Sequence, residues 1–125
     1  MATGNVRGFA GFWLLVIGFI DMDIKKIDVY QRSYRLAIEI HHFSLTLPSY
    51  LRYDLSDQMR RASRSIPSNI REGLMRNKSN KDKVNFLRTA IGSNDEILFN
   101  LDFLKDSELM EEKRFQYFVS EYDIV

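Results

Sequence analysis

The sequence predicts an all-α protein, most simply an up-down-up-down four-helix bundle whose fourth helix is short. Apolar residues recur at steps of three and four in four successive segments, which is the period of one helix face. After Asp28 only Pro48, Pro67, Gly73 and Gly92 interrupt the pattern, which favours long helices. No strand-like alternation of useful length occurs in the sequence, and four amphipathic helices with short links pack most simply as a bundle.

The first helix is expected from Asp28 to Leu47. Its apolar or small stripe consists of Val29, Ser33, Leu36, Ile40, Phe43 and Leu47. Pro48 ends the helix, because the residue before a proline is driven out of the α region. A connection of about seven residues follows, which suits antiparallel neighbours.

The second helix is expected from Leu55 to Leu74, with Asp54 or Ser56 as its cap. Its apolar stripe consists of Leu55, Met59, Ala62, Ile66, Ile70 and Leu74. Pro67 lies inside this segment, where a proline removes one backbone hydrogen bond and costs about 3 kcal/mol. Because the stripe continues past Pro67 without a change of phase, we expect one continuous, kinked helix.

The third helix follows a polar link at residues 77–80 and carries two apolar rows, which predicts that it is the most buried helix. The first row is Val84, Leu87, Ile91, Asn94, Leu98 and Leu101, and the second is Phe86, Ala90, Ile97 and Leu104. Asn94 is a polar residue within the first row, a position that often fixes register or oligomeric state. Gly92 and Ser93 offer a small surface for another backbone.

The fourth helix is expected from about Met110 to Val125. Its apolar residues are Phe115, Phe118, Val119 and Tyr122.

We divide the chain into an apolar N-terminal extension, residues 1–21, and a four-helix bundle, residues 22–125. The extension holds twelve consecutive apolar residues at Phe9–Ile20, fewer than the roughly 20 that a membrane-spanning helix needs. A signal peptide would carry a basic leader and a small-residue cleavage site, and the residues around this run match neither feature well. We favour an overextended reading frame with a native start at Met22; the alternative is a short hydrophobic anchor or partner-binding helix.

The composition is that of one globular domain, with 45% hydrophobic and 28% charged residues in 125. The absence of cysteine excludes disulfides, thiolate metal sites and cysteine nucleophiles, and it fits a cytoplasmic protein. A net charge of +1 conceals an asymmetry, because residues 56–83 carry +5 and residues 94–125 carry −6. This asymmetry favours either a positive face for a polyanion or packing between oppositely charged helices or subunits.

The residues that could carry chemistry do not form a recognisable catalytic or metal-binding set. Glu39 and His42 have the Glu-x-x-His spacing of a di-iron bundle, but such a site needs a second copy, and His41 and His42 are the only histidines. Ser63, Ser65 and Ser68 have no histidine placed to activate them, and the sequence holds no glycine-rich phosphate loop. We expect no enzymatic activity, no metal site, no cofactor and no small-molecule substrate.

Basic residues are the stronger functional signal. Arg60, Arg64 and Arg71 lie on one stripe of the second helix, away from its apolar face. The candidate nucleic-acid-binding residues are Arg60, Arg61, Arg64, Arg71, Arg76, Lys78, Lys81, Lys83 and Arg88. Guanidinium groups match phosphate geometry, and clustered cations gain affinity through counterion release. The alternative is a solvated face whose arginines form salt bridges with the acidic half of a neighbouring subunit.

Three segments carry a specific combination of short motifs. They are Val29-Tyr30-Gln31-Arg32; Leu55, Gln58, Arg60-Arg61-Ala62, Ser65-Ile66, Asn69-Ile70 and Glu72-Gly73; and Phe86-Leu87, Ala90, Gly92-Ser93 and Glu96. In this order they resemble the bacterial four-helix-bundle proteins encoded in intervening sequences of 23S rRNA genes. The resemblance covers about residues 28–122, and residues 1–21 have no counterpart in it.

The resemblance implies a bundle that assembles into a ring, specifically a homopentamer, without established enzymatic activity. A related accessory protein of diversity-generating retroelements looks like a basic ring that works with a reverse transcriptase and nucleic acid. By this resemblance Arg60, Arg61 and Arg64 belong to the ring surface or to the subunit contact. We assign structural roles to Pro67, Asn69, Glu72, Gly73, Gly92 and Asn94. The fourth helix is shorter than the family pattern, which would leave part of the third helix uncovered.

Two hypotheses follow. The leading one is a non-enzymatic oligomeric bundle that binds RNA or DNA through its basic surface without strong sequence specificity. The alternative is a structural or scaffolding homo-oligomer that acts through protein–protein contacts.

Overall fold

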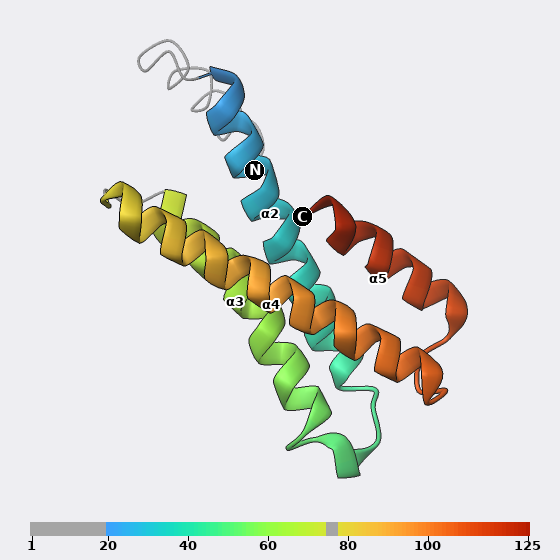
Figure 1. Ribbon diagram of the computed structural model, residues 1–125. Coiled ribbons are helices and arrows are strands. Elements are labelled where there is room, and N and C mark those ends of the chain that lie inside the picture. The colour runs from blue at the N-terminus through green and yellow to red at the C-terminus, as the bar shows by residue number, and fades with distance from the viewer. Residues whose placement is uncertain (1–19, 75–77) are drawn as a thin grey trace.

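The computed structural model describes residues 20–74 and 78–125, with side chains from residue 28 onward (Figure 1). The elements are α2 (Ile20–Ser44), the short 3-10 helix η1 (Ser49–Leu51), α3 (Leu55–Leu74), α4 (Asn80–Asp106) and α5 (Glu112–Ile124). The described ranges hold no strand, and the predicted all-α four-helix fold is confirmed. The apolar run expected at residues 9–20 lies almost entirely outside the described residues.

The helices alternate in direction along the chain, as Figure 1 shows. α3 packs against both α2 and α4 and is the central helix of the bundle. α5 turns back at the far end of α4 and lies at the side of the molecule, where its end approaches the middle of α2 (Figure 1). With 13 residues against the 27 of α4, α5 is the short fourth helix that the sequence predicts.

The first helix differs from its expected range, 28–47, at both ends. α2 already begins at Ile20 and stops at Ser44. The Thr46 N–H donates to the Phe43 carbonyl at 2.9 Å, and the Thr46 hydroxyl donates to the same oxygen at 2.7 Å. Such short-range bonds offer the backbone an alternative to the α-helical ladder, so the helix ends before Pro48 is reached.

α3 continues through Pro67, as the unbroken apolar stripe predicts. Pro67 is buried rather than exposed at a helix end. Near it, the Asn69 amide donates to the Ser65 carbonyl at 2.8 Å and to the Ser65 hydroxyl at 3.0 Å. These bonds tie the Asn69 side chain to the turn of α3 that precedes it. The kink at Pro67 stays a prediction.

Gly73, and not Gly92, lies at a close contact between α3 and α4. A Cβ atom at Gly73 would lie 3.1 Å from Phe86 Cβ and 3.3 Å from the Lys83 carbonyl oxygen. A Cβ at Gly92 would meet nothing within 4 Å among the described residues. No backbone of the described residues approaches Gly92, which lies on the solvent side of α4, so a close neighbour there stays a prediction.

α4 is less buried than its two apolar rows predict, and α3 is the most buried helix. The buried residues of α4 are Ala90, Ile97, Asn100, Leu101 and Leu104. Val84 and Ile91, from the first row, are 49% and 64% exposed. The prediction for α4 is wrong because the short α5 runs along only one end of α4. Among the described residues, no helix covers the remaining length of the first row.

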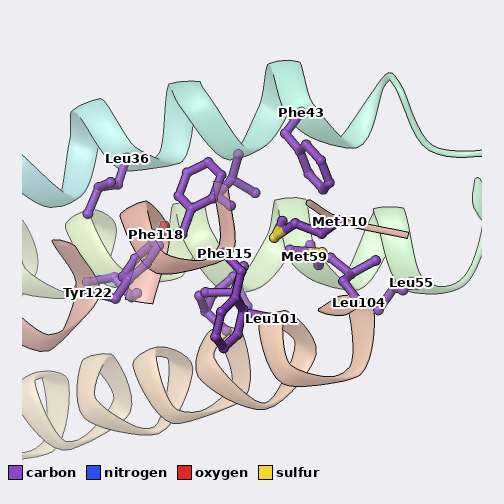
Figure 2. Packing of buried hydrophobic residues seen from close by; sticks show 14 of the residues in the cluster. Leu36, Phe43, Leu55, Met59, Leu101, Leu104, Met110, Phe115, Phe118 and Tyr122 are labelled. Carbon is purple, nitrogen blue, oxygen red and sulfur yellow. The ribbon is translucent and has the colours of Figure 1, made fainter. Parts of the chain in front are cut away.

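All four helices contribute to one apolar core, which Figure 2 shows from close by. Leu36 and Phe43 enter from α2, Leu101 and Leu104 from α4. The aromatic residues expected on the fourth helix are buried: Phe115, Phe118 and Tyr122. Phe118 meets the Phe43 ring edge-on, with centroids 6.2 Å apart.

Candidate nucleic-acid interface

The predicted basic residues do not form one continuous patch. Arg76 lies outside the described residues. The others are divided among a groove between α2 and α3, the beginning of α3, and the beginning of α4. The basic residues at these three places differ in exposure and in whether they already bind a partner within the protein.

Arg64 and Arg71 lie seven residues apart on the outer side of α3, and both are exposed. They line a groove of about 500 Å³ between α2 and α3, which we call the α2–α3 groove. Its lining residues are Tyr30, Tyr34, Ala37, Ile38, His41, Arg64, Pro67, Ser68 and Arg71. None of these is acidic, and neither arginine forms an ion pair within residues 20–74 and 78–125. These two guanidinium groups are available to an anion.

Arg60 has a structural role at the junction of α2 and α3. Its guanidinium donates to the Ser44 hydroxyl at 3.0 Å. The Ser56 hydroxyl, which the sequence offers as a helix cap, donates to the Ser44 carbonyl at 3.4 Å instead. Together these bonds fasten the beginning of α3 to the end of α2. Arg60 also borders a separate pocket of about 310 Å³, shared with Arg52.

Arg61 lies on a different side of α3 and pairs with an acid of its own helix. Its Nε is 3.2 Å from an Asp57 carboxylate oxygen, one turn earlier. The side chains of Arg61 and Asp57 are 64% and 44% exposed, so this pair contributes only about 0.3–0.5 kcal/mol. Arg61 remains accessible but is already neutralised.

The remaining predicted cations gather at the beginning of α4. Lys78 lies over the Phe86 ring, with its Nζ 5.3 Å from the ring centroid. Lys83 is half-buried beside the α3 contact. Lys81 and Arg88 are exposed and seven residues apart, so they share a face of α4. They form a second positive surface, separate from the α2–α3 groove.

The ion pairs between α2 and α5 use residues that the sequence did not single out. Arg32 Nη1 lies 3.4 Å from Glu121 Oε1, and Arg35 binds the same carboxylate oxygen. The Tyr117 hydroxyl donates to Glu39 Oε1 at 2.6 Å. We call these five residues the polar clamp. The donated hydrogen bond to Glu39, with partial burial, raises the pKa of Tyr117 above its ordinary value of 10.

Sequence reasoning missed the aromatic part of the groove. By its position in the sequence, Tyr34 lies next to the apolar stripe of the first helix and widens it, which predicts burial, yet it is 54% exposed. Ile38, one turn further, is 46% exposed. The sequence did offer a signal for these groove residues, because positions 34 and 38 carry large apolar residues four apart, beside the main stripe. Only the position of α3 shows that they border a groove.

The remaining polar positions carry no assembled chemistry in the part of the chain that the structure describes. His41 and His42 are exposed, and no group of three or more His, Asp or Glu in that part is placed to hold a metal ion. Asn94 Oδ1 and the Tyr122 hydroxyl are buried without a hydrogen-bond partner among the described residues. Burial raises the pKa of Tyr122. Of the described helices, none has both the length and the apolar character that crossing a bilayer requires.

Fold and surface together define a small all-α bundle whose distinguishing features are an arginine-lined groove and exposed apolar residues on α4. The family model for the 23S rRNA-intervening sequence protein matches residues 25–125. The chain belongs to this family, as its motifs led us to expect.

One solved structure supports the fold. The chain is similar to a protein with unknown function from the S23 ribosomal protein family of Bacteroides thetaiotaomicron VPI-5482. The two are 24% identical, the match covers 80% of this chain and 90% of that one, and the TM-score is 0.72. At this identity the likeness establishes the shared fold alone. No curated protein matches the chain.

Proposed function

We propose that this protein is a non-enzymatic, cytoplasmic, oligomeric helical bundle that binds RNA or DNA through its basic surface without strong sequence specificity. The observation that supports this most directly is the pair Arg64 and Arg71. Both are exposed, both line the α2–α3 groove, and neither is paired with an acid in the described part of the chain.

Phosphate binding by these arginines follows from their charge and geometry. A guanidinium group can bind a phosphate through two parallel hydrogen bonds. Each phosphate that a protein cation neutralises also releases condensed counterions, which makes affinity fall steeply with salt. Because Arg64 and Arg71 need not break an existing ion pair, the full gain is available for binding. Lys81 and Arg88 would extend the contact to α4.

The proposal is tested by RNA binding at several salt concentrations. Compare the wild-type protein with an Arg64→Gln/Arg71→Gln variant, using fluorescence anisotropy and a generic labelled RNA. Loss of two phosphate contacts should make the negative slope of log K against log salt shallower by about 1.4 for a single strand. Lys113→Gln/Arg114→Gln on α5 removes equal charge elsewhere and should leave most of the affinity. Equal affinity and slope for wild type and the groove variant would contradict the proposal.

A second candidate function is a scaffolding homo-oligomer, the pentamer that the family resemblance implies. Its supporting observation is an exposed face of α4 that carries Gly92, Phe99 and Phe103 at steps of seven and four. Phe99 is 68% and Phe103 is 51% exposed. Exposed apolar residues grouped on one face are typical of protein contact surfaces.

This candidate predicts that the phenylalanines determine the oligomeric state. Phe99→Ser/Phe103→Ser should convert the oligomer to monomers in size-exclusion chromatography with light scattering. An oligomer of unchanged mass would count against the α4 face as the contact. RNA binding by the same variant then shows whether assembly and nucleic-acid binding are separate properties.

A further inference from the structure

The α2–α3 groove has an aromatic floor as well as basic residues. Tyr30 and Tyr34 stack on one another, with ring centroids 6.1 Å apart and an angle of 27° between the rings. Tyr30 is half-buried, whereas Tyr34 is 54% exposed. The Tyr34 ring therefore packs against Tyr30, while about half of the Tyr34 residue surface stays accessible. Ile38 extends the apolar floor by one turn.

The two cations of the groove are spaced along the same floor. Arg64 and Arg71 are seven residues apart on one helix, which corresponds to about 10.5 Å along its axis. A stacked strand rises by about 3.4 Å for each nucleotide, so this spacing matches about three nucleotides. Ser68, which also lines the groove, adds a hydroxyl donor between the arginines in sequence.

The size of the groove is that of a short ligand segment. About 500 Å³ lies within the usual range for ligand pockets, roughly 300–1,000 Å³. The combination of stacked rings and cations without an ion pair among the described residues favours nucleotides as the occupant.

We propose that the α2–α3 groove binds unpaired nucleotides of a single strand, with a base stacked on Tyr34 and phosphates bound by Arg64 and Arg71. This inference rests on the proposed nucleic-acid binding and adds the kind of nucleic acid. In a duplex the base faces are covered by neighbouring base pairs, so only phosphates and groove edges are accessible. An unpaired base offers a free aromatic face to a tyrosine ring.

The test compares an oligouridylate of about 20 nucleotides with an RNA duplex of the same length, by fluorescence anisotropy. Stacking contributes about 1–3 kcal/mol for each base, so Tyr34→Ala should weaken single-strand binding by about 5- to 150-fold. Duplex binding should change by less than about twofold, because phosphate contacts dominate it. Tyr34→Phe keeps the ring and should retain affinity. Tyr53→Ala, at a residue 88% exposed outside the groove, is the matched control.

The outcomes separate this inference from the proposed function. Equal losses for single strand and duplex in Tyr34→Ala, or no loss in either, would overturn base stacking. If Arg64→Gln/Arg71→Gln still loses affinity in that case, phosphate binding stands and stacking alone fails. Dissociation of an oligomer by Tyr34→Ala, without a selective loss of single-strand binding, would identify the groove as a subunit contact and overturn the inference. Circular dichroism melting of each variant checks that the helices are intact.

Discussion

α3 and α5 are held in the same bundle by different means. α3 lies between two helices and buries its apolar stripe against them, and it also makes close contacts to α4 at Gly73 and Ser65. α5 lies at the edge and is anchored by three large aromatic side chains and the polar clamp: Phe115, Phe118 and Tyr122, with Tyr117 and Glu121. Close packing stabilises α3, whereas a few long side chains stabilise α5.

This difference predicts two kinds of response to mutation. A tightly packed helix cannot accept added volume or charge, because neighbouring backbones would have to move. A peripheral helix with few anchors can separate while the rest of the bundle persists, as low-stability regions of proteins do. Changes in α3 should therefore unfold the whole domain, and changes in α5 should act locally.

The largest effect is expected from Ile66→Asp, at the centre of α3. Ile66 is 1% exposed, and burying an unpaired carboxylate there costs several kcal/mol, comparable to the about 5–15 kcal/mol that stabilises a whole domain. The variant should show no cooperative unfolding transition in urea by circular dichroism. Ile124→Asp, at a residue 58% exposed on α5, should unfold like wild type. A cooperative fold in Ile66→Asp would remove the distinction between the two helices.

A smaller, local effect is expected from Phe118→Ala on α5. Loss of this buried ring and its contact with Phe43 should cost about 3 kcal/mol. Hydrogen exchange should become faster at residues 112–124, because α5 separates while α3 keeps its neighbours. If α3 and α5 lose protection together, α5 is part of the same cooperative unit as α3.

Alanine substitutions at Gly73, in the α3–α4 contact, and at Gly92, on the solvent side of α4, should change stability in opposite directions. Gly73→Ala should destabilise by about 1 kcal/mol, because its Cβ would press on Phe86 and on the Lys83 backbone. Gly92→Ala should stabilise by about 0.5–1 kcal/mol, since alanine favours the helix and its Cβ meets open space within the chain. Urea midpoints measure both. The same sign for both substitutions would show that the packing at Gly73 can relax.

The smallest effect at neutral pH concerns the tyrosines of α5. The pKa values of Tyr117 and Tyr122 are raised above 10, by the hydrogen bond to Glu39 and by burial respectively. The folded state therefore holds these protons more tightly than the unfolded chain does. Their contribution to the free energy of unfolding is fully present below about pH 10, and it is lost as the pH rises through the pKa values of the folded state.

Urea midpoints measured from about pH 8 to about pH 11 test this. The free energy of unfolding should fall above about pH 10. Amide hydrogen exchange should become faster on α5 before it does on the other helices. Tyr117→Phe/Tyr122→Phe should flatten that fall, because neither phenylalanine can ionise. A wild-type profile that stays level above pH 10 would contradict the predicted coupling between these protons and α5 docking.

Much of the fold was predictable because helical period is a local property. The four segments, the continuity of α3 through Pro67 and the short last helix all follow from spacing and from a few breaker residues. The end of α2 was missed because Ser44 and Thr46 bond to the nearby backbone before Pro48 takes effect. The burial of α4 was overestimated because a face counts as buried only where another helix runs beside it.

The basic residues themselves were identified from sequence, but their roles were not. Arg60 bonds to Ser44 and Arg61 to Asp57, whereas Arg64 and Arg71 have no ion pair in the described part of the chain and lie beside two stacked tyrosines. The clamp arginines that meet the acidic α5 are Arg32 and Arg35, which lie on another helix. The sequence specifies the sign of each charge, but the partner of each charge depends on residues far away in sequence.

The sequence by itself determined the helical class, the apolar stripes, the family and the positive charge of the second helix. These depend on residue type and on a repeat of 3.6 residues, which act over a few turns. The tertiary structure decided which glycine admits a close neighbour, which apolar row is left uncovered and which arginines are free. Those outcomes depend on helix lengths and on the side chains that crossing helices bring together, which no local pattern specifies.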